Sequence, residues 1–491
     1  MNKRDAIDAA RHIMTGPRAY EMERLDRIAD SLTPWTEEKA QYLLAGSGHS
    51  EEPSNGMKWR SQTNFLPLVL DVYSQSMKVD NYLSSTTKET ATPWKWWQRN
   101  KMVARQTGLV RGALEFGASY TTVLPSMPPP GAEAGEPGAY IRCLSPRQMT
   151  CLYGEAVEWK PGVTPIDDDW PMSALEIKDR MVRLYDEEYV HFIGVENVPE
   201  SALGWIDPYY SGEGNFKYLE ARHHDVGVCP VVRYRDRWLL NGEEQFGIIE
   251  PLINIQARVD ETTYEMSASQ YFTAFVQRWV AGWRPQNDEQ ALTMAQGDTW
   301  YFSSADVKVG QFSAGDVKGY IESKQSAVRD IASISQTPAQ NLGVDALVNI
   351  SEATLAGLEA GKDRKSAEIQ TALGESFEQL FRTCAHITGD KSASMDFGAE
   401  VKWRDATARS FAQQVDGLVK LAAGLGIPDE LTWEMVPGAT KEWVDRAIEV
   451  RDKQKAEMEA EMAAQPQLPP AGQPPAPRPG PNQPPQGGQQ Q

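Results

Sequence analysis

The feature that most constrains this fold is one apolar stripe that runs through residues 350–387. Apolar side chains recur there at steps of three and four residues, which is the spacing of a single helical face. A helix of that length spans roughly 55 Å. Gly357 and Gly361 lie within it, so we expect a kink or close backbone packing there. The stripe consists of Leu355, Leu358, Ile369, Leu373, Phe377, Leu380, Cys384 and Ile387, with Lys362 and Lys365 at its two intervening positions.

Two shorter helices and a small β element precede this long helix. Pro251 suits the first turn of a helix, because its missing N–H costs nothing there. The stripe that follows predicts a helix over 250–279. Residues 298–316 are typical of a small β element, and a second amphipathic helix is predicted over 317–336. That helix must stop at Thr337, since Pro338 disfavours helical backbone before it.

The segment between the second helix and the long one reads TPAQNLGVDALVNISE, residues 337–352. It consists mainly of small and polar residues and carries one charge, Asp345, before its last residue. Asn349 and Glu352 have the spacing of a capping box, which predicts the start of the long helix near residue 350. This connection between two helices is long and carries little charge. We interpret it as a loop that faces something that must slide past it.

The N-terminal half has mixed α and β character. Spaced apolar residues predict two or three surface helices over 3–45 and a packed helix over 64–77. A helix ending near Gly117 should be followed by a strand in SYTTVLP. Residues 139–154 predict a strand, a turn at Ser145-Pro146 and a returning strand. Short strands and turns alternate over 155–235.

The region after the long helix returns to helical patterns. A strand is predicted at 399–405, and helical stretches are predicted at 407–424, 429–436 and 440 to about 464. The fold class is therefore α+β and predominantly helical.

The last 27 residues contain ten prolines together with Gly and Gln, a composition typical of a disordered tail. Such a segment offers too little apolar surface to offset its ordering entropy. We expect truncation after Ala464 to leave both the midpoint of thermal unfolding and the assembly state unchanged. Calorimetry and size-exclusion chromatography check this, and a clear loss in either would mean that the tail packs.

Composition limits the classes of function. The chain has 491 residues, a length that predicts two or more structural units. Its 41% apolar residues predict that most of it folds. Its net charge is −19, from 68 acidic and 49 basic residues. A static nucleic-acid binder is disfavoured, because Lys and Arg supply that affinity by neutralising phosphates. An acidic surface does permit nucleic acid to pass without sticking.

Other features concern the compartment. Cys143, Cys151, Cys229 and Cys384 form no CxxC pair, so we expect reduced, buried thiols. The N-terminus carries no apolar signal region. No run of about 18 apolar residues exists to span a membrane. These features predict a soluble protein made in a cytoplasm.

Candidate metal sites are weak. His223, His224, Asp225 and Cys229 are potential ligands, but adjacent histidines seldom point to one site and no second ligand pair has zinc spacing. The run 167–169 is Asp-Asp-Asp, but the glycine and downstream glutamate of an EF-hand loop are missing, which favours a solvated acidic turn.

A tryptophan cluster admits two interpretations. Three tryptophans could stack on nucleobases with support from nearby basic residues. They are Trp94, Trp96 and Trp97, beside Arg99, Lys101 and Arg105. We favour aromatic anchors in a core or a subunit interface. The chain contains no GxxxxGK[ST] loop, HExxH or GxSxG motif. We therefore expect no catalytic residue, metal or cofactor.

This order of elements resembles the portal proteins of long-tailed bacteriophages of the siphophage type. NFLPLVLDVYSQSM, WQRN, GASYTTVLP and IRCLSPRQMTCLYG are similar to that family's N-terminal wing. CPVVRYRDRW followed by GIIEPLINIQARVDETTYEM resembles the transition from wing to stem. TPAQNLGVDALVNISEATLAGLEAGKDRK, the most specific stretch, resembles the tunnel loop and the helix after it. VKWRDATARSFAQQVDGLVKLAAGLGIPDELTWEMVPG resembles the last wing strand and the crown; the resemblance covers roughly residues 60–450.

The resemblance implies a domain order. Residues 1–249 would form the wing, with 1–60 as peripheral helices. Helices 250–279 and 317–336 would form the stem on either side of a clip, 280–316. The tunnel loop would be 337–350, the long kinked wing helix and closing strand 351–405, the helical crown 406–464 and the tail 465–491.

The resemblance also implies a function. A homo-oligomeric ring, expected to be dodecameric, would sit at one capsid vertex of the virion after assembly in the host cytoplasm. It would act as the channel for packaging and ejection of double-stranded DNA and as the nucleus of procapsid assembly. Its partners would be the terminase large subunit, which supplies ATP hydrolysis, the major capsid and scaffolding proteins, and the head-to-tail connector.

The candidate site residues follow from these segments. A loop that touches moving DNA should offer short polar and apolar side chains, because every cation fixed on a phosphate adds affinity that must be broken at each step. The tunnel-loop residues are Gln340, Asn341, Gly343, Asp345, Asn349 and Ser351. The clip residues expected to contact partners are Arg278, Trp283 and Arg284, and the stem residues are Lys318, Lys324 and Arg329.

Two rival interpretations stay open. One is another ring or minor head protein of the virion, although such proteins are usually smaller and do not need a stem–clip–stem order. The other is a metal-dependent nuclease that uses the acidic run 167–169 with a divalent metal ion. Incubation with plasmid and magnesium or manganese separates the second from a structural role.

Overall fold

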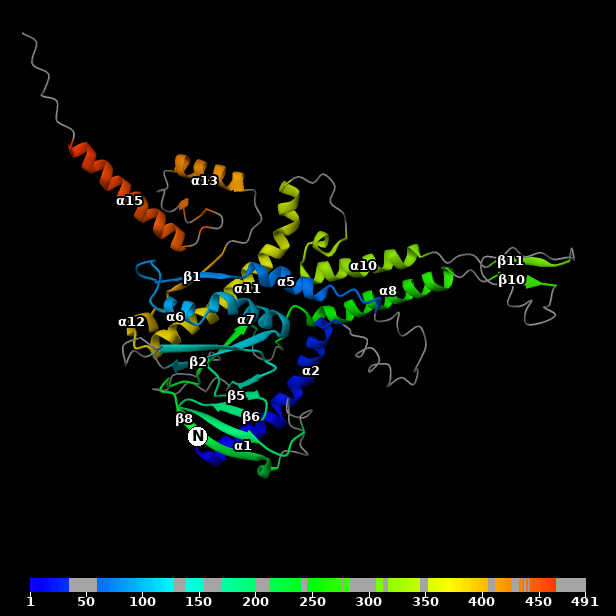
Figure 1. The fold of residues 1–491 in the computed structure, drawn as a ribbon, viewed down its shortest axis with the longest axis horizontal. Coiled ribbons are helices and arrows are strands. Elements are labelled where there is room, and N and C mark those ends of the chain that lie inside the picture. Colours follow the sequence, from blue (N-terminus) through cyan, green and yellow to red (C-terminus); the bar gives the residue numbers. More distant parts are fainter. Residues whose placement is uncertain are drawn as a thin grey trace, which may run out of the picture. The chain divides into compact units, whose positions relative to one another are not determined.

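A computed structural model of the chain divides it into two compact units, Met1–Thr407 and Ala408–Gln491 (Figure 1). The residues that the structure describes are 1–34, 60–126, 138–153, 170–199, 212–239, 245–274, 278–282, 306–311, 317–344, 352–404, 411–425, 432–433, 435–436, 439 and 441–464.

A five-stranded antiparallel sheet and the first helix form one part of the first unit. The strands run in the order β4-β5-β6-β7-β8. Helix α1 (Lys3–Thr15) packs against β6 and β8 through one apolar face that includes Ile13 and Met14. The predicted peripheral helix thus helps to close a core. The strands are β4 (Met149–Leu152), β5 (Ser173–Lys178), β6 (Met181–Tyr185), β7 (Tyr189–Val195) and β8 (Phe216–His223), the last preceded by the 3₁₀ turn Glu213–Asn215.

A three-stranded antiparallel sheet forms a second layer, in the order β3-β2-β9. Its strands are β2 (Ala118–Ser126), β3 (Gly138–Leu144) and β9 (Val231–Arg235). Helix α7 (Met102–Phe116) leads into β2 through Gly117, as predicted. Gly117 has φ +87°, and a Cβ there would meet the Phe246 backbone at 2.8 Å, so glycine is required. Helices α2 (Pro17–Leu32) and α5 (Leu66–Ser76) contact α7.

The prediction that the strand after the turn in residues 139–154 returns alongside the first strand is wrong. Both strands exist, and Gln148 N–H donates a turn hydrogen bond to Ser145 O. They do not pair with each other, because β3 pairs with β2 while β4 pairs with β5 of the other sheet. The turn therefore carries the chain from one sheet to the next instead of closing a hairpin.

The tryptophan cluster lies in the core, as the preferred interpretation predicted. Trp94, Trp96 and Trp97 belong to helix α6 (Trp94–Arg99) and are buried. Trp97 contacts Phe381 and Phe377, each with ring centroids 5.4 Å apart. Buried rings in such contact stabilise the fold and are not available to stack on nucleobases.

The long helix, α11, runs without a break from Glu352 to Ile387 and is followed by the short α12 (Lys391–Ser394). It packs against β9, β2 and β3 of the three-stranded sheet. From Ile369 to Cys384 the predicted stripe is buried. Leu358 is 44% exposed, however, because the first turns of α11 extend beyond this core. A Cβ on Gly357 or Gly361 would meet no described atom within 4 Å, so close packing is absent there within the described chain.

A two-stranded sheet joins distant parts of the sequence. Strand β1 (Val79–Leu83) pairs antiparallel with β12 (Glu400–Trp403), with Val79 opposite Trp403. This confirms a strand within 399–405. Tyr82 of β1 stacks on Phe381 of α11 at 4.3 Å, so the pair also closes the aromatic core.

The second unit contains helices α13 (Phe411–Leu425) and α15 (Lys441–Ala464), as predicted from the sequence. Of the predicted helix at 429–436, only residues 432 and 433 are described as helical. Within this unit the Arg451 guanidinium lies 5.5 Å from the centre of the Trp433 ring. The predicted tail, 465–491, lies outside the described residues.

Glu378 of α11 lies beside β12 and has an unusual environment. Its Oε1 accepts a hydrogen bond from the Val401 N–H at 3.2 Å. Burial and the nearby carboxylates of Glu375 and Glu400 raise the pKa of Glu378 to about 7, although Val401 and Arg382 oppose the shift.

This raised pKa predicts a pH dependence of stability. The native state binds the Glu378 proton more tightly than the unfolded chain, whose value is 4.5, so stability falls as pH rises from about 4.5 through about 7. We expect Glu378→Gln, which still accepts the Val401 hydrogen bond, to unfold at a higher temperature than the wild type above pH 7. The two proteins should converge near pH 4.5. Unfolding midpoints measured across this range check it, and parallel curves would contradict it.

Candidate functional site

Two helices that lie side by side dominate the region in which the sequence places functional residues (Figure 1). They are α8 (Ile253–Ala274), preceded by the 3₁₀ turn Glu250–Leu252, and α10 (Lys318–Ser335). The helices contact each other along their lengths. They lie within the predicted helices over 250–279 and 317–336, but residues 278 and 279, which were predicted to be helical, belong to strand β10. An ion pair between Arg258 of α8 and Asp330 of α10 joins them.

A small sheet lies between these helices in the sequence. Strand β10 (Arg278–Ala281) pairs antiparallel with β11 (Lys308–Gln311). Trp279 lies opposite Gly310, and a Cβ on that glycine would meet the indole at 2.5 Å. Gly310 therefore leaves the space that the Trp279 indole occupies, and a larger residue there would clash with it. The sequence indicated a β element at 298–316 but missed the strand β10.

The predicted clip residues are only partly described. Arg278 is the first residue of β10 and pairs with Gln311. Trp283 and Arg284 lie outside the described residues.

The start of α8 is fixed by helix α2. The Arg24 Nε donates to Glu250 Oε2 at 2.9 Å, and the Arg27 Nη2 donates to Glu250 Oε1 at 2.9 Å. Glu250 lies in the turn just before α8. Its two hydrogen bonds to α2 therefore fix the start of α8 relative to α2.

Residues 63–65 tie α8 to the body of the unit. The Gln256 side chain donates to Thr63 O at 2.8 Å and accepts from the Phe65 N–H at 3.0 Å. Asp260 accepts from the Thr63 N–H at 3.0 Å. Lys324 of α10, one of the predicted stem residues, donates to the Thr63 hydroxyl at 3.5 Å. This segment thereby contacts both helices.

Charges on the helix pair are mixed. Lys318, a predicted stem residue, lies 3.8 Å from Glu322, and Arg329 is exposed. No row of unopposed cations runs along the described part of the pair. The two helices carry four basic side chains (Arg258, Lys318, Lys324, Arg329) and five acidic ones (Asp260, Glu261, Glu265, Glu322, Asp330).

The end of α10 is clamped at the point where the predicted tunnel loop begins. The Ser335 carbonyl accepts from the Tyr73 hydroxyl at 2.7 Å and from Lys365 Nζ of α11 at 3.1 Å. A cation at a helix C-terminus is favoured by the helix dipole. Lys365 also lies 5.2 Å from the Tyr73 ring centre. Burial and the nearby Arg237 lower the pKa of Lys365.

The first part of the predicted tunnel loop is ordered by local turns. After Pro338 comes a 3₁₀ turn, Ala339–Leu342, and then Gly343 with φ +74°. Leu342 and Val344 are buried, whereas Asn341 and Gly343 are exposed. The Gln340 amide nitrogen is buried, with no hydrogen-bond partner among the described residues. Asp345, Asn349 and Ser351 lie outside the described residues.

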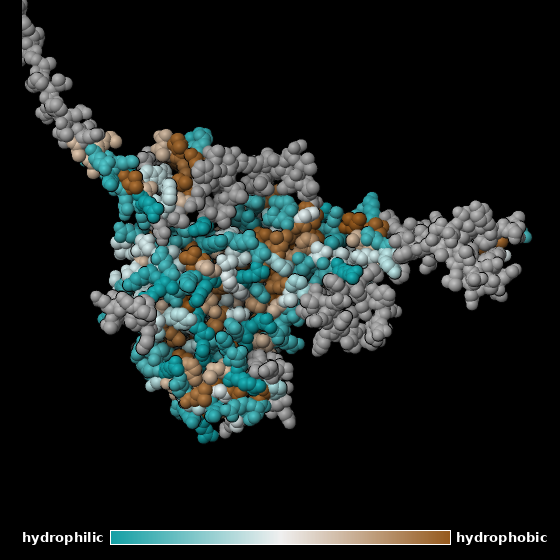
Figure 2. All heavy atoms as spheres, viewed as in Figure 1, coloured by the Kyte–Doolittle hydropathy of each residue, from teal (hydrophilic) through white to brown (hydrophobic). Residues whose placement is uncertain are grey.

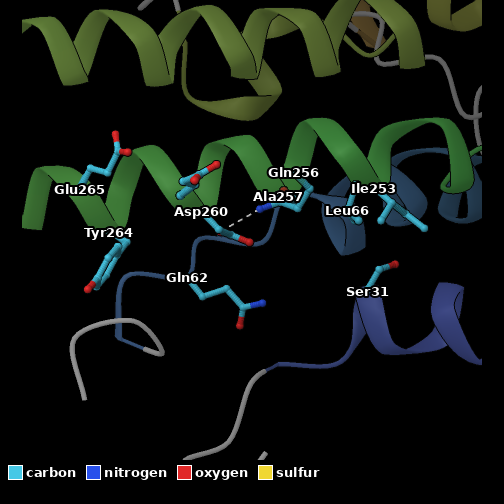
Figure 3. A pocket seen from close by; sticks show the side chains of 10 residues that line it. Ser31, Gln62, Leu66, Ile253, Gln256, Ala257, Asp260, Tyr264 and Glu265 are labelled. Carbon is cyan, nitrogen blue, oxygen red and sulfur yellow. Dashed lines mark hydrogen bonds between the residues drawn. The ribbon is translucent and has the colours of Figure 1, made fainter. Parts of the chain in front are cut away.

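A pocket of about 460 Å³ lies along one face of α8 (Figure 3). It is lined by Ser31 at the end of α2, by Gln62 and Leu66, and by α8, with Gln256 and Asp260 in its wall. Asp260 is held there by Gln256 and Thr63, and burial raises its pKa. Neither a nucleophile–base pair nor a metal-ligand set lines the described part of this pocket. The residues that line this pocket therefore do not indicate a catalytic site or a metal site.

The helix α10 keeps part of its apolar surface exposed. Figure 2 shows apolar side chains on the visible face of this helix, and Ile321 and Ile334 are exposed. These two side chains are thirteen residues apart and point to different sides of the helix, so they do not form one patch.

The discounted metal ligands do not converge. The His223 Nδ1 lies 2.7 Å from Asp225, while the His224 Nε2 contacts Asp186 O at 3.0 Å. Burial raises the pKa of Cys229 well above its ordinary value, which disfavours the thiolate that a metal needs. Among the described residues no group of three His, Cys, Asp or Glu could hold a metal ion. Residues 167–169 lie outside them.

No described helix is both long enough and apolar enough to cross a membrane. All four cysteines are free.

Comparisons with known proteins agree with one another. A family model described as "Phage portal protein, SPP1 Gp6-like" matches residues 17–466. The portal protein of Mycobacterium phage D29 is 23% identical over 371 residues, which cover 72% of this chain and 71% of the relative. The portal protein of Mycobacterium phage L5 is 22% identical over 432 residues, covering 84% and 79%.

Solved structures give more distant matches. A chain in the virion of a native gene transfer agent particle has a TM-score of 0.43 and 12% identity, and covers 79% of this chain and 94% of its own. A chain in the neck of the empty particle has a TM-score of 0.42 and 12% identity, with 78% and 88% covered. The family assignment rests on the sequence match. Because that match extends over most of its length, the chain belongs to the phage portal protein family, SPP1 Gp6-like, which is structural and not catalytic.

Proposed function

We propose that this chain forms a homo-oligomeric ring of about twelve copies at one capsid vertex, through which double-stranded DNA is packaged and ejected. The observation that carries the proposal is the family match over residues 17–466. The ring would also nucleate procapsid assembly in the host cytoplasm, together with the major capsid and scaffolding proteins.

The paired helices suit the stem of such a ring. A cyclic assembly needs one surface that contacts the next copy head to tail. The exposed side chains of α8 and α10 are available for such a surface. The sheet β10–β11 lies in the clip, where we place the contacts with the terminase large subunit and later with the head-to-tail connector.

The charges support a channel that does not hold its cargo. DNA binding strengthens with each Lys or Arg that neutralises a phosphate. Four basic and five acidic side chains on α8 and α10, in a chain of net charge −19, give little net attraction for DNA. Asn341 and Gly343, both exposed, are the described tunnel-loop residues best placed to face DNA. We predict that three further loop residues also face the DNA: Asp345, Asn349 and Ser351.

Negative-stain electron microscopy of the purified full chain tests the proposal. We expect rings of about twelve subunits with a central hole, in line with the cyclic symmetry of closed homo-oligomers. A monomer, or a closed particle without a channel, would contradict it.

The rival interpretations have separate tests. Another ring or minor head protein of the virion would form rings that do not bind a terminase, which a pull-down with the cognate large subunit measures. Plasmid incubated with the protein and magnesium or manganese should stay intact, because the family is structural. Metal-dependent cleavage would favour the nuclease.

A further inference from the structure

Strand β3 lies at the edge of the three-stranded sheet, whose order is β3-β2-β9. Hydrogen-bonding directions alternate along a strand. The Val123 N–H of β2 donates to Pro230 O at 2.9 Å on the β9 side, so Ile141, which lies opposite Val123, points its backbone groups away from the sheet. Two side chains cover these groups. Ile141 N–H donates to Asn100 Oδ1 at 3.0 Å, and Arg105 Nη1 donates to Ile141 O at 3.4 Å.

Cys143 is the next residue of β3 whose backbone groups point outward, because it lies two positions after Ile141. Among the described residues, no group hydrogen-bonds its N–H or C=O on that side. An unpaired strand edge is a template for a further strand. An extended segment of another chain that pairs there makes both hydrogen bonds, which is a common way in which domains bind peptides.

A groove of about 470 Å³ lies beside this open edge. One wall is the face of α7 that carries Arg105, Gly108 and Leu109, and the other includes Tyr140 and Cys143 of β3. A Cβ on Gly108 would meet no described atom within 4 Å, so the groove is open at that point. Its volume is many times the space that one water needs. A side chain of a segment paired with Cys143 therefore has room to enter it.

The charge around the groove is opposite in sign to that of the whole protein. Residues 90–114 contain five basic residues and no acidic one, in a chain of net charge −19. Four of the five are exposed, and no carboxylate of the described chain forms an ion pair with them. They are Lys95, Arg99, Lys101 and Arg105. The last two lie one helical turn apart, next to the open edge, so an acidic segment would be attracted there.

The groove favours a protein segment over a nucleic acid. Tyr140 is 44% exposed, and Leu109 adds further apolar lining. A peptide would cover these side chains and also pair with the strand edge. Nucleic acid would use only the cations, because the nearby tryptophan rings are buried and cannot stack on its bases.

We propose that the open edge of β3 and the groove beside it bind an extended, acidic segment of another protein. The segment exchanges hydrogen bonds with the Cys143 N–H and C=O as an added strand. Its carboxylates approach Lys101 and Arg105, and one apolar side chain enters the groove over Gly108. None of the residues that line the groove belongs to α8 or α10, so failure of this proposal would leave the proposed ring untouched.

Isothermal titration calorimetry of the full chain at physiological salt tests the proposal. The probe is a short acetylated and amidated peptide of alternating glutamate and valine, and glutamine replaces glutamate in its neutral analogue. We expect saturable binding of the acidic peptide below millimolar concentration and at least tenfold weaker binding of the neutral one. No saturable binding of the acidic peptide, or equal binding of both, would overturn the proposal, as would displacement of the peptide by a DNA duplex.

Two further peptides test the strand pairing. They carry N-methyl groups on the valines or on the glutamates, which removes alternate backbone N–H donors. At least one of them should bind tenfold more weakly than the parent peptide, because the Cys143 C=O then lacks its donor. Unchanged binding of both would rule out an added strand.

Variants locate the binding. Gly108→Leu fills the groove and should weaken the acidic peptide about tenfold, or about 1.4 kcal/mol. Its unfolding midpoint should equal or exceed that of the wild type, since leucine favours a helix more than glycine does. Lys101→Gln should weaken binding less, and Lys217→Gln, an exposed position on β8 outside the groove, should not change it. Unchanged binding by Gly108→Leu, or a lower unfolding midpoint, would refute the assignment.

Discussion

The double variant Leu373→Asp with Phe377→Asp should not form a folded first unit. Both side chains are fully buried on α11, and the Phe377 ring lies 4.9 Å from Tyr234 and 5.4 Å from Trp97 between centroids. Burying an unpaired carboxylate costs at least several kcal/mol, and a whole domain is stable by only about 5–15 kcal/mol. Circular dichroism and chromatography should show loss of cooperative unfolding and an aggregated product.

A matched control lies on an exposed face of the same helix. Ala367 and Thr371 are exposed, so Ala367→Asp with Thr371→Asp adds the same two charges at the same spacing. This control should fold and assemble like the wild type. If the Leu373/Phe377 variant also produced intact rings, the buried face of α11 would not be what holds this unit together.

The second large effect concerns movement of DNA and not folding. Asn341→Lys with Asp345→Lys changes each subunit by three charge units, one from the first substitution and two from the second. In a ring of twelve this is about thirty-six units, facing a duplex with one charge per about 1.7 Å. We expect normal rings and procapsids but slow or stalled packaging, most severely at low salt, where phosphate contacts are strongest. A packaging assay across salt concentrations measures it.

The neutral pair Asn341→Ser with Asp345→Asn is the control for this experiment. It alters the same two positions with a change of one charge unit, so its packaging rate should stay near that of the wild type. A lysine pair that packages at the normal rate at low ionic strength would mean that this segment does not touch DNA, and the tunnel-loop assignment would fall with it.

Local periodicity predicted the helices well. The stripe on α11, the paired α8 and α10 and the stop at Pro338 are consequences of residues close in sequence. The burial of Trp94, Trp96 and Trp97 was likewise predictable, because three large rings within four positions strongly favour a shared core.

Partners distant in sequence could not be predicted. Tyr73 contacts the Ser335 carbonyl across 262 residues, and Arg24 contacts Glu250 across 226. Nothing in the spacing of one sequence says which polar groups will meet at such separations. The error at 139–154 has the same origin, because two neighbouring strands look like a hairpin whether they pair with each other or with separate sheets.

Because β1 pairs with β12, strand β1 is synthesised long before its partner strand. Val79 leaves the ribosome 324 residues before its partner Trp403. At about 5–20 residues per second, that interval lasts roughly 15 to 65 s. Throughout it, the edge of β1 lacks its strand and Tyr82 lacks the Phe381 ring made late in α11. An unpaired strand edge invites pairing with other chains. The edge of β1 therefore stays open to such pairing until the chain has been made as far as Trp403.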